Sequence, residues 1–309
     1  MPSRRAVLAL GAAAVLTGCS APSPRGVLRL AAGPEGGPYR TFGLRLAEEI
    51  GRAHPGLTVE VLSTAASVRN LRLIGEGGAE LGLTLADSAA DAVAGRGAFD
   101  RPVPVAAIAR LYLNYLHLVV PADRPVPAVG ELAGRRFSIG ADGSGTAVVA
   151  ERVLAAAGAT PAGARLLGPA ESVAALEAGE LDAFFWSGGV PTRAITGLAE
   201  RLPVRLVPLA AQAAALRTAY GPVYEAVSIP LGAYRQAAPT PTVGTPSYLV
   251  CAAGLDPEIA RAVTEVLFRR RDHLQTPDAP GGRLDERYAI GTGTVPLHPG
   301  AARHYRAVH

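Results

Sequence analysis

The chain alternates short apolar segments with amphipathic segments along most of its length. Residues 27–31 are apolar and lead into a glycine-rich turn, after which Phe42, Leu46 and Ile50 recur at the four-residue spacing of one helical face. The same order recurs further on, with strands predicted at 57–62, 81–85, 136–140, 183–186 and 204–207 and helices beginning at 67, 86, 146, 171, 191 and 210. Ser67 is a candidate N-cap of the first of these helices. Such alternation predicts an α/β fold, in which helices cover a sheet.

Two places along the sequence predict that the chain crosses between two lobes. The apolar stretches 105–112 and 115–120 are typical of buried strands, and the proline-rich residues 121–127 lead away from them into a second domain. A strand predicted at 242–251 returns the chain to the first domain, which continues with a long helix at 258–274. The predicted division is lobe I at 27–115 plus 248–309 and lobe II at 116–247, joined by a hinge.

The first nineteen residues have the pattern of a bacterial export signal. Two arginines precede the apolar run 6–16, which is too short to span a bilayer and ends in Leu16-Thr17-Gly18-Cys19. A cysteine directly after Leu-x-Gly resembles the lipobox, in which the thiol takes a diacylglycerol and becomes the new N-terminus. We therefore predict a signal peptide at 1–18 and a lipidated tether at 19–26 that begins with Cys19.

This reading locates the protein at the extracytoplasmic face of the bacterial cytoplasmic membrane, held to membrane lipid through Cys19. Two alternatives stay open. The segment can be an ordinary secretory signal with an incidental cysteine, and Ser3-Arg4-Arg5 resembles a twin-arginine export signal.

The composition excludes several chemistries. All 30 basic residues are Arg, so no lysine can serve a P-loop, a Schiff base or a Ser-Lys pair. The net charge is +4, and without Arg4 and Arg5 it is +2, because 28 arginines then face 26 acidic residues. Neither nucleic acid nor an anionic membrane surface is therefore indicated as a partner. Cys251 lies in an apolar run and is expected to be a buried thiol without a disulfide partner.

Catalytic and metal-binding patterns are absent from the sequence. The six histidines contain no H-E-x-x-H pair, and neither Ser144 nor Ser187 has the glycines of a nucleophile elbow. His117 alternates with leucines, which favours a structural histidine over a general base. We predict no catalytic residue, no metal site and no cofactor, and hence a protein that is not an enzyme.

Three predicted strand-to-helix turns, at 33–39, 63–70 and 142–146, carry small and polar residues that can face one crevice. In the third, Gly143-Ser144-Gly145-Thr146, glycines allow close backbone approach and the following helix N-terminus attracts an anion such as a carboxylate. The alternative is a plain tight turn with a Ser or Thr cap. A dinucleotide fingerprint is excluded, because Val148 stands where its third glycine is required.

Two other residues each have two interpretations. Trp186 ends a predicted strand before a glycine pair and Pro191, and it can either wall a cleft or anchor the core. Asp87 follows the strand at 81–85 and can either bind a ligand or cap the next helix.

Taken in order, these motifs resemble the TAXI family, the extracytoplasmic solute-binding subunits of one branch of the TRAP transporters. The likeness runs across nearly the whole chain after the export signal. The motifs that carry it are Gly36-Gly37-Pro38-Tyr39 with Gly43, Ser67-Val68-Arg69-Asn70-Leu71, Asp87, Gly143-Ser144-Gly145-Thr146, the segment 184–192 around Trp186, the segment 241–246 and the segment 295–302.

The resemblance implies a two-lobed fold like that of the type II periplasmic binding proteins, with two α/β domains joined by hinge strands around a ligand cleft. It also implies capture of a small organic acid or amino acid, such as a dicarboxylate or glutamate, for delivery to a TRAP membrane permease. We expect a monomer. The expected ligand-binding residues are Tyr39, Arg40, Ser67, Asn70, Asp87, Gly143, Ser144, Gly145, Thr146, Trp186, Gly189 and Thr192.

This chain departs from the family pattern at two places. The family commonly has a second aromatic residue after Tyr39, where this chain has Arg40, and a glutamine or similar polar residue near Leu85, which is also replaced here. An inward guanidinium could pair with a second ligand carboxylate, whereas an outward one is solvated. Two other functions also stay open: a lipid-anchored sensor module that signals to a membrane receptor, and an enzyme on the same two-lobed fold.

Overall fold

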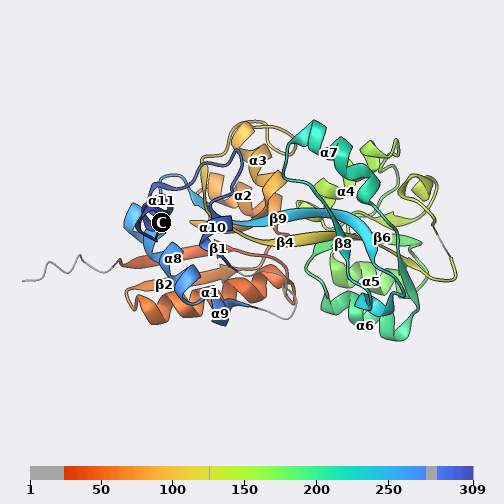
Figure 1. Cartoon of the computed structure of the whole chain (residues 1–309), viewed down its shortest axis with the longest axis horizontal. Coiled ribbons are helices and arrows are strands. Elements are labelled where there is room, and N and C mark those ends of the chain that lie inside the picture. Colours follow the sequence, from red (N-terminus) through yellow and green to blue (C-terminus); the bar gives the residue numbers. More distant parts are fainter. Residues whose placement is uncertain (1–23, 125, 276–283, 309) are drawn as a thin grey trace, which may run out of the picture.

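The computed structural model describes residues 24–124, 126–275 and 284–308. The predicted signal peptide and Cys19 lie outside these residues. The described chain forms two lobes side by side, and both β4 (Val105–Pro121) and β9 (Thr240–Ala252) run from one lobe into the other (Figure 1). These two antiparallel strands stand next to each other in one mixed sheet of the order β2-β1-β3-β9-β4-β6-β5.

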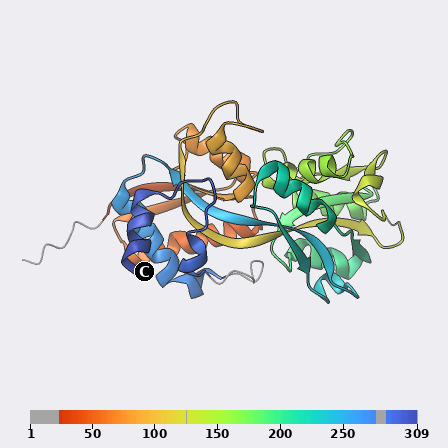
Figure 2. The same cartoon turned by 45° about the horizontal axis from the view of Figure 1, so that its top comes forward.

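In lobe I the sheet has helices on both faces, as the periodicity of the sequence predicts. On one face α1 and α8 pack with α11 against the strands, through Phe42, Leu46 and Val263 among others. The other face is covered by α2 and α3 (Figures 1 and 2). These two helices pack through Leu71 and Ala89. The elements of this lobe are β1 (Gly26–Ala31), α1 (Pro38–Ala53), β2 (Leu57–Leu62), α2 (Ser67–Gly75), β3 (Leu81–Leu85), α3 (Ala86–Ala94), α8 (Pro257–Arg269), α9 (Arg271–Leu274), α10 (Glu286–Ala289) and α11 (Pro299–Val308).

Lobe II repeats this three-layer arrangement. Helices α4 and α7 cover one face of its strands, with Val153 and Leu216 in the core, and helices α5 and α6 cover the other, with Leu176 and Leu198. Its elements are β5 (Phe137–Ser138), α4 (Gly145–Ala156), α5 (Pro169–Glu177), β6 (Ala183–Gly188), α6 (Arg193–Arg201), β7 (Val204–Leu206), α7 (Ala213–Tyr220) and β8 (Glu225–Ile229), with short 3-10 turns at Val129–Leu132, Ala210–Gln212 and Ala233–Arg235.

The structure corrects several local predictions. The two strands expected at 105–112 and 115–120 are one strand, β4, whose pairing with β9 shifts register twice, at bulges that bend the strand. The helix expected at 258–274 is interrupted at Arg270. Strand β8 and helix α11 were not predicted. The lobe boundaries after residues 115 and 247 fall inside β4 and β9 and stay predictions.

Ser67 was a candidate N-cap, and this prediction is wrong. Helix α2 begins at Ser67 itself, Ala66 is the N-cap residue, and the Ser67 hydroxyl accepts a hydrogen bond from the backbone N–H of Leu85 at 3.0 Å. The side chain therefore ties α2 to the end of β3 instead of capping its own helix.

Two other features concern the chain as a whole. Within the described ranges, no helix is long and apolar enough to cross a membrane. Cys251 is buried and free, as expected, and burial raises the pKa of its thiol to about 12. A thiol with so high a pKa is protonated and inert at neutral pH.

The packing around β3 supplies the first prediction. Leu83 is fully buried in the core of lobe I, whereas Leu44 on α1 is 49 % exposed. Leu83→Ala should lower the free energy of unfolding by about 2–5 kcal/mol, because it leaves a cavity among close-packed side chains. Leu44→Ala is the matched control and should change it by less than about 0.5 kcal/mol. Denaturant unfolding measures both, and equal losses would contradict the described packing.

Candidate functional site

A cavity lies between the two lobes. The centres of water-sized molecules can occupy about 90 Å³ of it, which is room for a small molecule. Lobe I and lobe II contribute to opposite walls. The residues that line it are Pro34, Gly37, Pro38, Tyr39, Ala65, Ala66, Ser67, Leu85, Asn114, Gly140, Ala141, Ser144, Gly145, Thr146, Leu167, Gly168, Pro169, Phe185, Trp186 and Ser187.

The N-termini of four helices meet at this cavity. Its lining includes the N-cap residues Gly37 of α1, Ala66 of α2, Ser144 of α4 and Gly168 of α5. Each helix N-terminus carries a partial positive charge from its aligned peptide dipoles. The cavity is therefore a place of positive potential.

Several backbone N–H groups at these ends remain available. Within the described residues, the backbone N–H groups of Ser67 and Val68 in α2 donate no hydrogen bond. The same holds for those of Gly145 and Thr146 in α4. The first N–H groups of a helix have no partner in the helix itself, so a ligand oxygen can satisfy them.

The side chains of the cavity wall are uncharged. Among the described residues that line it, none is Arg, Asp or Glu, and much of the wall is apolar, with Leu85, Leu167 and Phe185. A chain of hydrogen bonds forms part of the wall: Asn114 Nδ2 donates to Ser247 Oγ at 2.5 Å, and Ser247 Oγ lies 2.8 Å from the Tyr39 hydroxyl. Burial raises the pKa of Tyr39, so this phenol stays protonated at neutral pH.

The loop before α2 is held rigidly by Asn70. Its buried amide donates to the backbone oxygens of Ala32 and Leu83 at 2.6 and 2.7 Å, and its Oδ1 accepts from the Thr64 hydroxyl at 2.5 Å. Ala66 is fixed at a φ of 80°, a conformation that costs a non-glycine residue about 1–3 kcal/mol. Asn70 thus lies behind the cavity and positions the loop whose end lines it.

On the lobe II side, the loop before α4 contains the Ser cap that was one of its two interpretations from the sequence, and the anion-binding interpretation stays a prediction. Ser144 caps α4, since its hydroxyl accepts from the N–H of Ala147 at 3.1 Å. Thr146 Oγ1 accepts from the N–H of Ser187 at 3.2 Å and ties α4 to β6. Both residues, with Gly145, also line the cavity.

Trp186 closes the lobe II end of the cavity. It is half-buried, and its ring N–H donates to Thr192 Oγ1 at 2.9 Å, which in turn donates to the backbone oxygen of Gly189 at 2.7 Å. Thr192 lines a separate small hollow that shares Trp186 with the cavity, and Gly189 lines neither space. Thr192 and Gly189 therefore orient the tryptophan instead of facing the cavity.

Arg40 and Gly143 line a different, more open hollow beside the cavity, together with Arg69 and Arg72. The Arg40 guanidinium lies 3.4 Å from the backbone oxygen of Val61 and 3.8 Å from Glu35. It does not reach the cavity wall.

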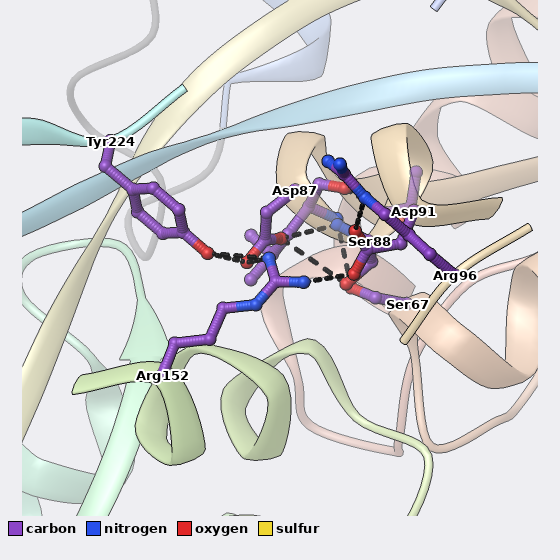
Figure 3. Close-up of polar contacts among 9 residues, drawn as sticks. Ser67, Asp87, Ser88, Asp91, Arg96, Arg152 and Tyr224 are labelled. Atoms are coloured by element: carbon purple, nitrogen blue, oxygen red, sulfur yellow. Dashed lines mark hydrogen bonds and ion pairs between the residues drawn. The ribbon is translucent and has the colours of Figure 1, made fainter. Parts of the chain in front are cut away.

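Asp87 is also absent from the cavity wall. It is fully buried on α3, where its Oδ2 accepts from the Tyr224 hydroxyl at 2.7 Å and lies 3.5 Å from Arg152 Nη1 (Figure 3). Burial raises the pKa of Asp87, and the charge of Arg152 acts in the opposite direction. Neither interpretation given to it from the sequence describes this pairing.

Six of the twelve residues expected at the site thus line the cavity: Tyr39, Ser67, Ser144, Gly145, Thr146 and Trp186. The cavity wall also includes Asn114, Ser187 and the segment 167–169, which were not predicted from the sequence. Asn114 had a signal that could have been used, because it is a polar residue in the middle of an apolar stretch. The segment 167–169 has no comparable signal.

Within the described ranges, no three His, Cys, Asp or Glu side chains come together as a metal site.

Comparison with known proteins identifies the same architecture. A sequence model of the NMT1-like family matches residues 30–308. A TctC solute binding protein from Polaromonas superposes with a TM-score of 0.51 and 17% identity, over 91% of this chain and 97% of that chain. A protein from Bordetella bronchiseptica RB50 superposes with a TM-score of 0.54 and 18% identity, over 91% and 89%. The fold is that of the two-lobed periplasmic binding proteins, as the sequence predicted.

His117 behind Trp186 gives the second prediction. It is fully buried, its Nδ1 donates to the backbone oxygen of Trp186 at 3.2 Å, and its Nε2 lies 3.1 Å from the Tyr234 hydroxyl. Burial lowers the pKa of His117 to about 4. Between pH 6.5 and about 4 the unfolded chain binds a proton that the native state does not, so the free energy of unfolding should fall as pH falls, by up to about 3 kcal/mol.

The test is the slope of the free energy of unfolding against pH in this window. His117→Gln should flatten the slope more than the control His54→Gln, which replaces a half-buried histidine at the end of α1. Some slope remains in every variant because burial also lowers the pKa of His298. An unchanged slope in His117→Gln would show that His117 has the same pKa in the native and unfolded states and would contradict the prediction.

Proposed function

The chain belongs to the NMT1-like family, and from this premise we propose that it is an extracytoplasmic solute-binding protein that takes a small organic acid into the cavity between its lobes. The observation that carries the proposal is the cavity itself, onto which four helix N-termini converge from both lobes. Closure of two lobes around such a space buries a ligand and surrounds it with hydrogen-bond donors.

The wall of the cavity supports a particular ligand class. Free N–H groups of α2 and α4 can bind one anionic group, each helix end contributing about 0.3–1 kcal/mol, or up to ~2 when partly buried. Leu85, Leu167, Phe185 and Trp186 offer an apolar surface for the rest of the molecule. A small carboxylic acid with an apolar body fits both features.

The same wall gives less support to an amino acid or a dicarboxylate. An ammonium group would need a carboxylate partner, and a second carboxylate is best met by a guanidinium, yet none of the described lining residues is charged. Arg40, the candidate for that second role, lies in the neighbouring hollow. We therefore narrow the organic acid or amino acid of the family resemblance to an acid with a single anionic group.

The delivery route rests on the sequence. The resemblance to TAXI subunits favours a TRAP membrane permease as the partner, and the lipobox at Cys19 favours a lipid anchor at the extracytoplasmic face of the membrane. Both features agree with a carrier that hands its solute to a permease close by, and we propose no catalytic step.

The direct test uses the purified protein without its export signal. Its thermal melting is followed with panels of monocarboxylates, dicarboxylates and amino acids. A ligand at about 100 times its dissociation constant should add ~2.7 kcal/mol of stability, which is several degrees for a chain of this size. Monocarboxylates should give the largest shifts. A panel without any shift would count against solute binding, and shifts confined to amino acids would contradict the ligand class.

Gly145 supplies a variant that tests the location of binding. A Cβ at this position would lie 2.5 Å from Ser67 Oγ and 2.7 Å from a methyl carbon of Leu85, both on the opposite lobe. Gly145→Ala should therefore hinder closure and weaken binding of the acid found by the panel at least tenfold, which is about 1.4 kcal/mol. Gly51→Ala, at an open position on α1, is the control and should bind normally. Equal affinities would place the ligand outside this cavity.

A further inference from the structure

A cluster of charged residues joins the two lobes behind the cavity. Asp87 and Asp91 lie on α3 of lobe I, whereas Arg152 lies on α4 and Tyr224 lies just before β8, both in lobe II (Figure 3). The Arg152 Nη2 is in direct contact with Asp91 Oδ2, and its Nη1 lies 3.5 Å from Asp87 Oδ2. All four residues are at most 9 % exposed.

The charges of this cluster balance only when the lobes are together. On lobe I, Asp91 has a partner of its own, Arg96, whose Nε lies 2.8 Å from Asp91 Oδ1. Among the described residues of its own lobe, Asp87 is bonded only to the N–H and the hydroxyl of its neighbour Ser88, at 2.7 and 3.4 Å. Its other described partners, Arg152 and Tyr224, come from lobe II.

Lobe II holds Arg152 ready for this contact. The guanidinium carbon lies 4.0 Å from the centre of the Tyr220 ring, and Nη1 donates to the Tyr224 hydroxyl at 2.9 Å. The rings of Tyr220 and Tyr224 meet edge to face, with their centres 6.3 Å apart. A cation fixed on an aromatic face loses little freedom when it pairs with a carboxylate.

The cluster is connected to the cavity through the elements that carry it. Leu85 lines the cavity, and Asp87 follows it by two residues at the start of α3. Gly145 and Thr146 line the cavity at the N-terminus of α4, and Arg152 lies about two turns further along the same helix. A movement that brings α4 over the cavity therefore brings Arg152 onto α3.

We propose that Arg152, with Tyr224, is an interlobe latch that pairs with Asp87 and Asp91 and holds the lobes together before any solute is bound. Such a latch raises the fraction of molecules in the binding-competent closed state and so sets the apparent affinity for the solute. Opening exposes Asp87 to water, which offsets part of the lost ion pairing. The latch is therefore releasable.

The test needs no ligand, so its outcome is independent of the proposed solute. The protein without its export signal is stripped of bound solute by denaturation and refolding, and its radius of gyration is measured by solution X-ray scattering. A compact chain of this size has a radius of gyration of about 19 Å. The wild type should have this closed value, and Arg152→Met, which keeps an apolar stem against Tyr220, should shift to a larger value.

The matched control is Arg96→Met, which removes a partner of the same Asp91 from within lobe I. It should keep the wild-type radius of gyration. Equal radii for Arg152→Met and the wild type, or the same increase in both variants, would overturn the latch.

A second pair of variants, each of which removes one hydroxyl group, keeps the test valid if Arg152→Met does not fold. Tyr224→Phe removes the hydroxyl that bridges Arg152 and Asp87 and should give a smaller increase in the same direction. Tyr220→Phe keeps the ring beneath Arg152 and removes a hydroxyl that makes no hydrogen bond within the described residues. The same radius for both tyrosine variants would also overturn the proposal.

Discussion

The pairing of β4 with β9 is the interaction on which the rest of this structure depends. The two strands run antiparallel through both lobes, β3 attaches to them in lobe I, and β6, β7 and β8 attach in lobe II. Two register shifts bend β4, one at 107–109 within the strands of lobe I and one at 110–113, just before the strands of lobe II attach. Because both lobes share these strands, the lobes stay side by side. Each lobe still has a hydrophobic core of its own.

This arrangement separates two kinds of electrostatic interaction. The described residues that line the cavity present partial charges, from helix N-termini and hydroxyl groups, to anything that enters it. Full charges lie behind it, where Arg152 faces Asp87 and Asp91. A ligand anion would therefore be bound by groups that need no counter-ion when the cavity is empty, while the ion pairs act on the position of the lobes.

Much of the fold could be predicted from local patterns. The spacing of apolar residues and the positions of glycines indicate each strand, helix or loop separately. The exceptions have long-range causes. Strand β4 is continuous because β9 pairs along most of its length, although Asn114 interrupts the apolar pattern. The role of Asp87 depends on Arg152 and Tyr224, 65 and 137 residues away, and no spacing in the sequence reveals that pairing. Cavity residues on turns, such as Ser67 and Thr146, were accessible to sequence reasoning, whereas the segment 167–169 was not.

The central claim is that a small anionic solute binds between the lobes, with its acidic group at the N-termini of α2 and α4. A crystal structure of the protein with the acid that stabilises it most would test this directly. We predict electron density for the acid in the cavity, with an oxygen within hydrogen-bond distance of the backbone N–H of Ser67, Gly145 or Thr146. Density for the acid in any other place, with the cavity unfilled, would contradict the claim.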